Sequence, residues 1–367
     1  MRLPAATLPL LLMLLLVTAC ATLPPPRATP DATAVEVAFV SESFPEDEID
    51  SLAVWKGAAG ERWLIATSKR ANRLLVFDAR DGRRLRRVGR YGDARGRFHR
   101  PNGIAIAGDL LLVAERDNRR VQVMTLPDFR SLGWFGDEVL RSPYGLWVMP
   151  VDEHRFRVFV TDSYMDVGIV VPAESRLDRR VREWSLSHTA EGVRAELAHT
   201  FGPTRAPGAL RIVESIWGDA ARGILLIAEE DMSRHGREVG LKVFGLDGAF
   251  QKRIVGVEHF AGQPEGIALW QCADGTGYWL ASDQSSTGQR FLVFDRPSFD
   301  FLGAFHNEGI SNTDGIWLQQ EAIEGFPYGA LYVVNDDQAV AAFDWRSIAS
   351  ALGLAEQCGS DVSAAGR

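Results

Sequence analysis

Short apolar segments alternate with turn residues along most of the chain, and the stretch from Gln263 to Arg296 shows this pattern most plainly. Its three apolar runs, Ile267 to Trp270, Tyr278 to Ala281 and Phe291 to Phe294, are separated by segments rich in Gly, Asp, Ser and Thr. Runs this short, rich in aromatic and β-branched residues and bounded by turn residues, are typical of β-strands. The stretch therefore predicts a small antiparallel sheet, which needs neighbouring sheets of the same kind to bury both of its faces.

The same unit recurs six times along the sequence. Each copy opens with one residue that precedes a small residue and an apolar strand; these opening residues are Asp50, Asn102, Tyr144, Glu214, Glu265 and Asp314. The second strands align as LIATSKR, LLVAERD, VFVTDSY, LLIAEED, WLASDQS and LYVVNDD. Their spacing of roughly 40 to 70 residues suits propeller blades with insertions. The pattern predicts an all-β fold, a six-bladed β-propeller with four-stranded antiparallel blades; a β-sandwich with coincidental glycine spacing is the alternative.

We expect the propeller to occupy residues 34–355 and the segment Ala34 to Val40 to pair with the last blade, because such overlap closes the ring. A short helix, about Trp345 to Leu354, ends the fold, and residues 356–367 form a C-terminal tail. The second blade, about Tyr91 to Phe135, resembles an NHL repeat, a motif of propellers. That resemblance supports the fold and says nothing about chemistry.

The N-terminus has the pattern of an export signal. Arg2 precedes an apolar run from Leu8 to Val17, which at about ten residues is too short to span a bilayer. The sequence Val17-Thr-Ala-Cys20 resembles a lipobox. We therefore expect residues 1–19 to be a lipoprotein signal peptide, Cys20 to carry the lipid, and the Pro-rich residues 20–33 to be a tether. The protein is then exported and lipid-anchored in the bacterial cell envelope; an ordinary secretory signal is the alternative.

Charge and cysteine content narrow the function classes. The 367 residues carry a formal net charge of −8, which argues against a nucleic-acid binder, although many basic residues lie between Arg80 and Arg100. Besides Cys20 the chain contains only Cys272 and Cys358. An oxidising compartment permits a disulfide between them, but the sequence leaves open whether they pair.

The opening residues of the six copies are the first candidates for chemistry. First strands line the central channel of a propeller, so these residues are expected at one mouth of the channel, beside the ends of the second strands. Four of the six are carboxylates, which repel one another unless a cation binds. All candidate ligands are oxygens, which indicates Ca²⁺ rather than Zn²⁺.

The ends of the second strands add charges of both signs. Lys69, Arg70 and either Arg116 or Arg119 come from the first two blades, and Glu229, Glu230, Asp231, Asp283 and Asp336 come from the last three. A mouth with acidic and basic sides suits a metal-bridged polyanion; solvated loop charges are the alternative. The seven histidines show no ligand spacing.

At these residues the chain resembles the β-propeller phytases, calcium-dependent phosphatases that hydrolyse inositol hexakisphosphate. The segments DEIDSLAVW, LLIAEED, PEGIALWQCADGTGYWLAS, NTDGIW and FPYGALYVV carry the resemblance. It implies metal ligation by Asp50, Glu214, Glu229, Glu265 and Asp314, with Glu214, Glu229 and Glu265 also in catalytic roles. It implies substrate binding by Lys69, Arg70, Arg119 and Tyr144, Ca²⁺ as cofactor, a phosphorylated small molecule as partner, and a monomeric enzyme.

The chain also departs from the pattern of that family. Ser51, Gln263 and the pair Asp162-Ser163 stand where the family has an aspartate, an aspartate and a Lys-Glu pair. Fewer anionic ligands predict weaker or fewer calcium ions, and the missing lysine weakens one phosphate contact. The leading hypothesis is a membrane-tethered phosphomonoesterase of the phytase type. The alternatives are a non-catalytic, NHL-like propeller lipoprotein that binds a ligand or partner, and another calcium-dependent propeller hydrolase such as a lactonase.

Overall fold

The computed structural model describes residues 32–286 and 288–359. The predicted signal peptide, Cys20 and most of the tether lie outside the described residues. In the described ranges no helix is both long enough and apolar enough to cross a membrane.

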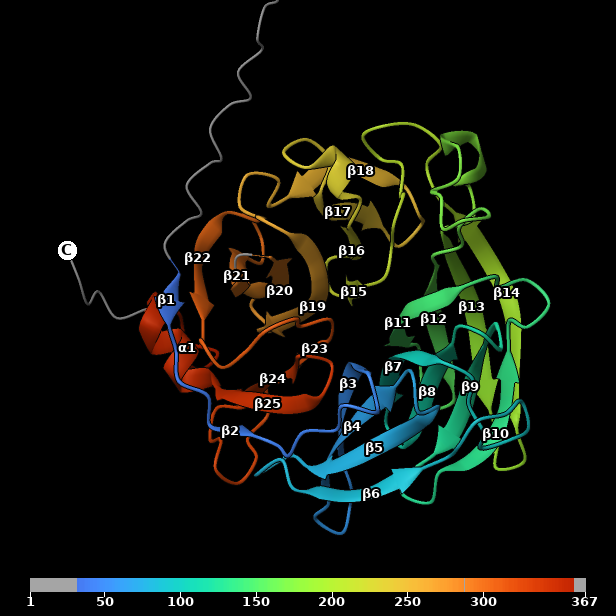
Figure 1. The fold of residues 1–367 in the computed structure, drawn as a ribbon, viewed down its shortest axis with the longest axis horizontal. Coiled ribbons are helices and arrows are strands. Elements are labelled where there is room, and N and C mark those ends of the chain that lie inside the picture. The colour runs from blue at the N-terminus through green and yellow to red at the C-terminus, as the bar shows by residue number, and fades with distance from the viewer. Residues whose placement is uncertain (1–31, 287, 360–367) are drawn as a thin grey trace, which may run out of the picture.

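Six antiparallel sheets are arranged in a ring around a central axis (Figure 1), which confirms the predicted six-bladed β-propeller. Blades one and two consist of β3 (Ile49–Lys56), β4 (Arg62–Ser68), β5 (Arg73–Asp78), β6 (Arg84–Val88), β7 (Pro101–Ala107), β8 (Leu110–Glu115), β9 (Arg120–Thr125) and β10 (Arg130–Phe135). Blades three and four consist of β11 (Pro143–Pro150), β12 (Arg155–Asp162), β13 (Val181–His188), β14 (Val193–Phe201), β15 (Ile216–Asp219), β16 (Ile224–Glu229), β17 (Gly240–Gly245) and β18 (Phe250–Val255).

The last two blades are completed by the N-terminal segment. Blade five consists of β19 (Gln263–Gln271), β20 (Gly277–Ser285), β21 (Gly288–Asp295) and β22 (Phe301–His306), and β1 (Thr33–Ala34) adds a parallel edge strand. Blade six consists of β23 (Ile316–Gln319), β24 (Ala330–Asn335), β25 (Ala339–Asp344) and β2 (Phe39–Val40), which is antiparallel to β25. The expected pairing of the N-terminal segment with the last blade is confirmed for Phe39 and Val40. This overlap covers the edges that would otherwise remain open.

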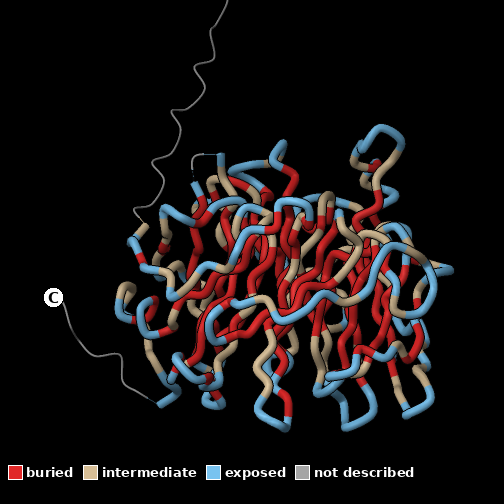
Figure 2. The backbone as a smooth tube through the Cα atoms, turned by 60° about the horizontal axis from the view of Figure 1, so that its bottom comes forward, coloured by how far each residue is buried: buried red, intermediate tan, exposed pale blue. Residues whose placement is uncertain are grey.

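The core is divided into six hydrophobic clusters, one between each pair of neighbouring blades. The cluster that closes the ring joins Leu64 of blade one to Tyr332 of blade six, and both side chains are fully buried. Figure 2 shows that the buried residues lie in the strands inside the ring and that the exposed residues lie mainly in the turns on its two faces. Every blade therefore buries both of its faces only through its neighbours, as the repeated apolar pattern predicts.

Two short helical turns lie in loops, η1 (Glu174–Arg176) and η2 (Met232–Arg234), and one α-helix, α1 (Trp345–Leu352), follows blade six. The carboxylate of Asp344 caps the first turn of α1, and Gly353 ends the helix in a left-handed conformation with φ of 65°. Trp345 stacks on Trp270 of blade five with ring centroids 5.5 Å apart. The helix therefore packs over the junction of blades five and six.

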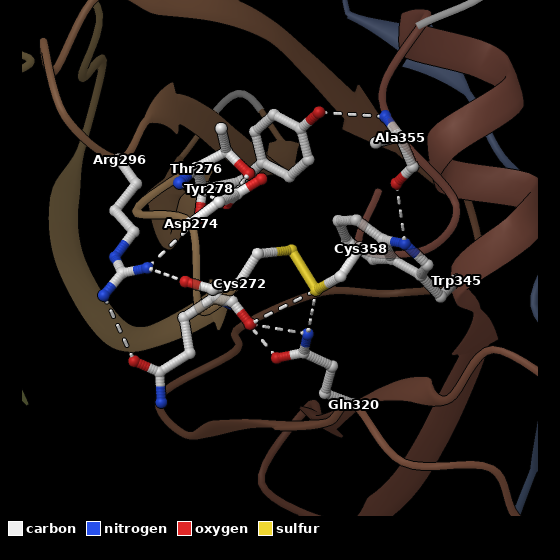
Figure 3. Close-up of a disulfide and its surroundings, with 10 residues drawn as sticks. Cys272, Asp274, Thr276, Tyr278, Arg296, Gln320, Trp345, Ala355 and Cys358 are labelled. Carbon is white, nitrogen blue, oxygen red and sulfur yellow. Dashed lines mark hydrogen bonds between the residues drawn. A yellow bond between two sulfur atoms is a disulfide. The ribbon is translucent and has the colours of Figure 1, made fainter. Parts of the chain in front are cut away.

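A disulfide between Cys272 and Cys358 ties the segment after α1 to the β19–β20 turn of blade five (Figure 3). The sequence left this pairing open, because the two cysteines are 86 residues apart. The bond closes a loop that contains blade six, so it holds the last blade and the helix to the ring.

We expect the double variant Cys272→Ser/Cys358→Ser to fold but to lose about 2–4 kcal/mol of unfolding free energy, because an unfolded chain without this cross-link gains loop entropy. Equilibrium urea unfolding of both proteins measures the difference. Wild-type protein in dithiothreitol should match the variant, and an unchanged urea midpoint in either sample would contradict the prediction.

Candidate functional site

The predicted mouth residues meet at one end of the channel. The antiparallel register places the start of each first strand opposite the end of its second strand, as in the pair Ile49 and Ser68. The Lys69 Nζ lies 2.9 Å from Asp50 Oδ1 and 3.0 Å from Asp314 Oδ2, although Lys69 and Asp314 are 245 residues apart in sequence. The Tyr144 hydroxyl donates to Asp50 Oδ1 at 3.3 Å. Blades one, three and six therefore share one site.

Close packing of neighbouring blades fixes these positions. A Cβ atom added to Gly145 would lie 2.1 Å from the carbonyl oxygen of Glu214, and one added to Gly315 would lie 2.3 Å from that of Asp50. Only glycine lets the backbones approach so closely. The glycine after an opening residue therefore allows the next blade to bring its own opening residue into the mouth.

Three glutamates form the centre of the site. Glu214, Glu230 and Glu265 each offer one carboxylate oxygen, and these oxygens all lie within 4.8 Å of one another. We call these three residues the acidic cluster. Glu230 and Glu265 are 2% and 5% exposed. Oxygen donors at this spacing suit a hard divalent cation.

The electrostatics of the cluster favour protonated carboxyl groups when no cation is present. Burial, reinforced by the charge of Asp50, raises the pKa of Glu214 to about 8. Burial and neighbouring carboxylates also raise the pKa values of Glu230 and Glu265 well above their ordinary range. Burial alone would lower the pKa of Lys69, but the charges of Asp50 and Asp314 raise it instead. Lys69 therefore remains a cation beside carboxyl groups that repel one another.

Several buried polar atoms in the site have no hydrogen-bond partner among the described residues. They are Oε1 of Glu230, Oδ1 of Asp337, and Oδ1 and Nδ2 of Asn102, the opening residue of blade two. Leaving such groups buried and unpaired is costly, so each one calls for an explanation. A bound ligand at the mouth would supply the missing partners.

A second set of polar residues, at the ends of the second strands, holds the loops that lead into the first strands. Its members are hydrogen-bonding groups in the same register of every blade, namely Ser68, Glu115, Asp162, Glu229, Asp283 and Asn335. Asp162 accepts from the amides of Arg141 and Ser142, and Asp283 accepts from those of Ala261 and Gly262. We call this set the loop anchors. The residue after each anchor is left to face the mouth or its rim.

Glu229, which the sequence analysis assigned to the metal ligands, is a loop anchor in the structure. Its carboxylate accepts from the amides of Arg211 at 2.7 Å and Ile212 at 3.1 Å and lies 3.1 Å from Lys242 Nζ, with no exposure to solvent. The carboxylate is thus fully engaged as a loop anchor. The structure brings Glu230 into the acidic cluster instead of Glu229. Adjacent strand residues point to opposite sides, so an offset of one residue exchanges the two environments.

The four residues predicted to bind substrate are placed differently. Lys69 and Tyr144 lie in the mouth, as their contacts with Asp50 show. The Arg70 side chain is 62% exposed and pairs with Glu48 at 3.3 Å, which places it at the rim. Arg119 is exposed in the β8–β9 turn with φ of 55°, and within the described ranges its side chain forms no ion pair with a residue of the mouth.

Two further mouth residues escaped the sequence-based assignment. Gln284 donates to Asp314 Oδ1 at 2.8 Å. Burial, followed by the charge of Asp314, raises the pKa of Asp337 to about 7. The sequence did offer a signal, because the loop anchors are small or acidic polar residues in every blade, whereas the residues that follow them vary in charge. These following residues are Lys69, Arg116, Ser163, Glu230, Gln284 and Asp336. In blade six the backbone adopts positive φ at both Asp336 and Asp337; Asp336 is exposed, whereas Asp337 is partly buried near Asp314.

Below the mouth the channel is narrow. Trp217 of blade four and Trp317 of blade six contact each other edge to face, with ring centroids 5.3 Å apart. The remaining cavity measures about 50 Å³ and is lined by the first strands. A ligand larger than a few water molecules therefore reaches the acidic cluster from the mouth and not through the channel.

Fold and site together define a six-bladed propeller with an acidic cluster at the mouth of its channel. The model of the Phytase family matches residues 211–351, a segment that contains the acidic cluster and Asp314. This match and the six-bladed propeller fit a β-propeller phytase-like family, in agreement with the resemblance found in the sequence. No curated protein matches the chain in sequence.

Similar solved structures extend the comparison of folds. A gluconolactonase from Xanthomonas campestris is 17% identical, with a TM-score of 0.54 over 87% of this chain and 98% of that chain. A chain of a nidogen/laminin complex is 13% identical, with a TM-score of 0.47 over 76% of this chain and 88% of that chain. The first similarity shows a shared fold, and the second carries no argument about function.

Glu229→Gln and Glu230→Gln should change the stability of the metal-free protein in opposite directions at pH 8. Glu229→Gln leaves Lys242 buried without its counter-charge, which should lower the unfolding free energy by about 3 kcal/mol. Glu230→Gln removes a buried carboxyl group whose ionisation burial and the neighbouring carboxylates oppose, and should raise the unfolding free energy by about 1 kcal/mol. Urea unfolding in chelator measures both values, and a larger loss for Glu230→Gln would contradict the division of roles.

The metal-free protein should lose stability as the pH rises from about 5 to 8. The folded-state pKa of Glu214, about 8, exceeds its ordinary value of 4.5, so the folded state holds the extra proton in this window. The proton on Glu214 contributes its full stabilisation below pH 4.5, and this contribution is lost as the pH rises to about 8. Between these two pKa values the unfolding free energy should fall by about 1.4 kcal/mol per pH unit for each such group. Thermal unfolding in chelator tests this, and Glu214→Gln should flatten the slope. A stability that rises over this window in wild-type protein would refute the account.

Proposed function

We propose that the protein is a calcium-dependent phosphomonoesterase of the phytase type, acting on inositol hexakisphosphate or a related phosphoester. The observation that carries the proposal is the position of the acidic cluster beside Lys69 and Tyr144 in a mouth closed from below. The match to the Phytase family model supports the same class of activity.

The donor set is compatible with calcium. Glu214, Glu230, Glu265, Asp50 and Asp314 offer oxygen atoms only, and one oxygen of Glu230 has no partner. These five residues would hold the metal. Calcium, when bound, supplies positive charge against phosphoryl oxygens and makes a coordinated water more acidic.

The remaining mouth residues have roles that follow from their positions. The ammonium group of Lys69, held by Asp50 and Asp314, donates hydrogen bonds and can turn one of them toward a phosphoryl oxygen. The Tyr144 hydroxyl, whose pKa burial raises well above its ordinary value, remains protonated and can donate to the same group. Arg70 at the rim can hold a second phosphate of the same substrate.

The departures from the family pattern support a second candidate, a propeller that binds calcium and a phosphoester without turnover. Ser51 donates from its hydroxyl to Asp50 Oδ2 at 2.9 Å, so it orients one carboxylate rather than adding another. Asp162 is a loop anchor, and the Ser163 hydroxyl accepts from the amide of Val213. Neither residue supplies the positive charge of the missing lysine. We also propose, from the sequence alone, that Cys20 anchors the protein in the cell envelope.

Phosphate release from inositol hexakisphosphate, measured with calcium and again after chelation, tests the enzyme proposal. We expect release with calcium and none after chelation. Lys69→Met should lower kcat/KM by about 100-fold, since a charge-assisted hydrogen bond and a Coulombic attraction to phosphate are both lost. Arg119→Gln is the matched control and should change it by less than about threefold.

Binding of calcium and substrate without phosphate release, by folded protein, would favour the non-catalytic candidate. An absence of calcium binding would contradict both. Glu230→Gln should weaken calcium binding by at least about tenfold in calorimetric titration, because one charged ligand is removed.

A further inference from the structure

An arginine-rich segment lies on blades one and two, outside the mouth. Residues 80–100 contain nine arginines and two aspartates, a formal charge of +7 by subtraction, in a chain whose formal net charge is −8. The segment covers the outer strand β6 and the loop that joins β6 to β7. Because β7 begins at the mouth, this loop lies on the mouth face of the propeller.

Most arginines of the segment are already paired. Arg84 contacts Glu42 at 3.1 Å, Arg87 contacts Glu46 at 3.5 Å, and Arg100 contacts Glu48 at 2.9 Å. Arg86 has no carboxylate partner but donates to the carbonyl oxygen of Pro127 and packs against two aromatic rings. Within the described ranges no ion pair with a carboxylate is found for Arg90, Arg95 or Arg97 either. The Arg95 guanidinium donates to the carbonyl oxygen of Ser131.

The three unpaired arginines surround one cavity. It measures about 330 Å³ and is lined by Gly89, Arg90, Arg95, Gly96 and Arg97. We call it the rim pocket. Three exposed arginine side chains line one space, so their positive charges add there and favour a bound anion.

The loop that carries these arginines is held rigidly from below. The carbonyl oxygens of Gly92, Asp93 and Arg97 accept hydrogen bonds from the side chains of Asn118, Arg120 and Gln122. Gln122 also accepts from the amide of Gly96 at 2.7 Å. Arg120 and Gln122 are 3% and 0% exposed, and Glu115 binds both. A loop anchored by buried side chains presents its arginines at a low entropic cost of binding.

We propose that the rim pocket binds an anion with two or more phosphoryl groups, and that it does so without a metal ion. The planar fork of arginine matches phosphoryl oxygens in pairs, and three such groups balance a multiply charged anion. The pocket is larger than one inorganic phosphate requires.

The rim pocket is connected to the mouth through paired side chains. Arg100, at the end of the same loop, donates to Glu48, and Glu48 also contacts Arg70 at 3.3 Å and Lys69 at 3.8 Å. A polyphosphorylated ligand in the rim pocket therefore lies at the start of a row of bases that leads to the acidic cluster. The binding itself does not depend on the proposed phosphatase activity.

Calorimetric titration of metal-depleted protein with inorganic pyrophosphate tests the proposal. Without calcium the acidic cluster repels the probe, so binding reports on the rim pocket. We expect one site in wild-type protein and an affinity at least about tenfold lower in Arg90→Gln/Arg95→Gln/Arg97→Gln. The control Arg83→Gln/Arg84→Gln/Arg87→Gln removes the same formal charge from arginines that face carboxylates, and should change the affinity by less than about threefold. Thermal unfolding verifies that both variants fold.

Three results would overturn the rim pocket as a phosphoryl site. They are no binding of pyrophosphate to wild-type protein, equal weakening in the two triple variants, and equal affinity for citrate. Lys69→Met should keep the pyrophosphate affinity while losing calcium-dependent phosphate release; loss of pyrophosphate binding in this variant would place the anion in the mouth and also overturn the proposal. Failure of the phosphatase assay alone leaves these readouts unaffected.

Discussion

In each blade a polar side chain at the end of the second strand, buried in every blade but the sixth, holds the loop that leads into the first strand, and the geometry of the mouth depends on this interaction. In blade four it is Glu229 that fixes the amides of Arg211 and Ile212, shortly before Glu214. In blade five Asp283 fixes Gly262 in the same way, shortly before Glu265. Hydrogen bonds that backbone amides donate to a fully buried carboxylate are strong and directional. The loops can therefore hold the mouth residues in place even though those residues repel one another.

The charged groups of the mouth destabilise the folded protein when no cation is bound. Glu214, Glu230 and Glu265 lie within 4.8 Å of one another, and burial raises the pKa values of all three. Lys69 forms ion pairs with Asp50, Asp314 and Glu48, and none of these belongs to the acidic cluster. Such an arrangement persists because six blade interfaces and the disulfide stabilise the ring around it. Strain concentrated in one place and supported elsewhere is expected of a site that gains its stability from a ligand.

The fold was predictable from the sequence because every blade repeats the same apolar strands and turn residues, so six weak signals reinforce one another. The residues that line the mouth could be predicted from the sequence to within about one position along the chain. Glu229 and Glu230 are neighbours of the same type, and only the direction of each side chain from the strand distinguishes a loop anchor from a member of the acidic cluster. Asp337 was missed because the backbone of the blade-six turn has positive φ at both Asp336 and Asp337, and the aligned sequences do not show which of the two side chains turns inward. The pairing of Cys272 with Cys358 depends on where α1 packs, which is a tertiary contact and not a local pattern.

A crystal structure of the protein grown with calcium, with anomalous diffraction recorded from the metal, tests the central claim most directly. The account predicts an anomalous peak about 2.3–2.6 Å from carboxylate oxygens of Glu214, Glu230 and Glu265, with Glu229 still bound to Lys242. A mouth without a metal peak at saturating calcium, or a peak coordinated by Glu229 in place of Glu230, would contradict it.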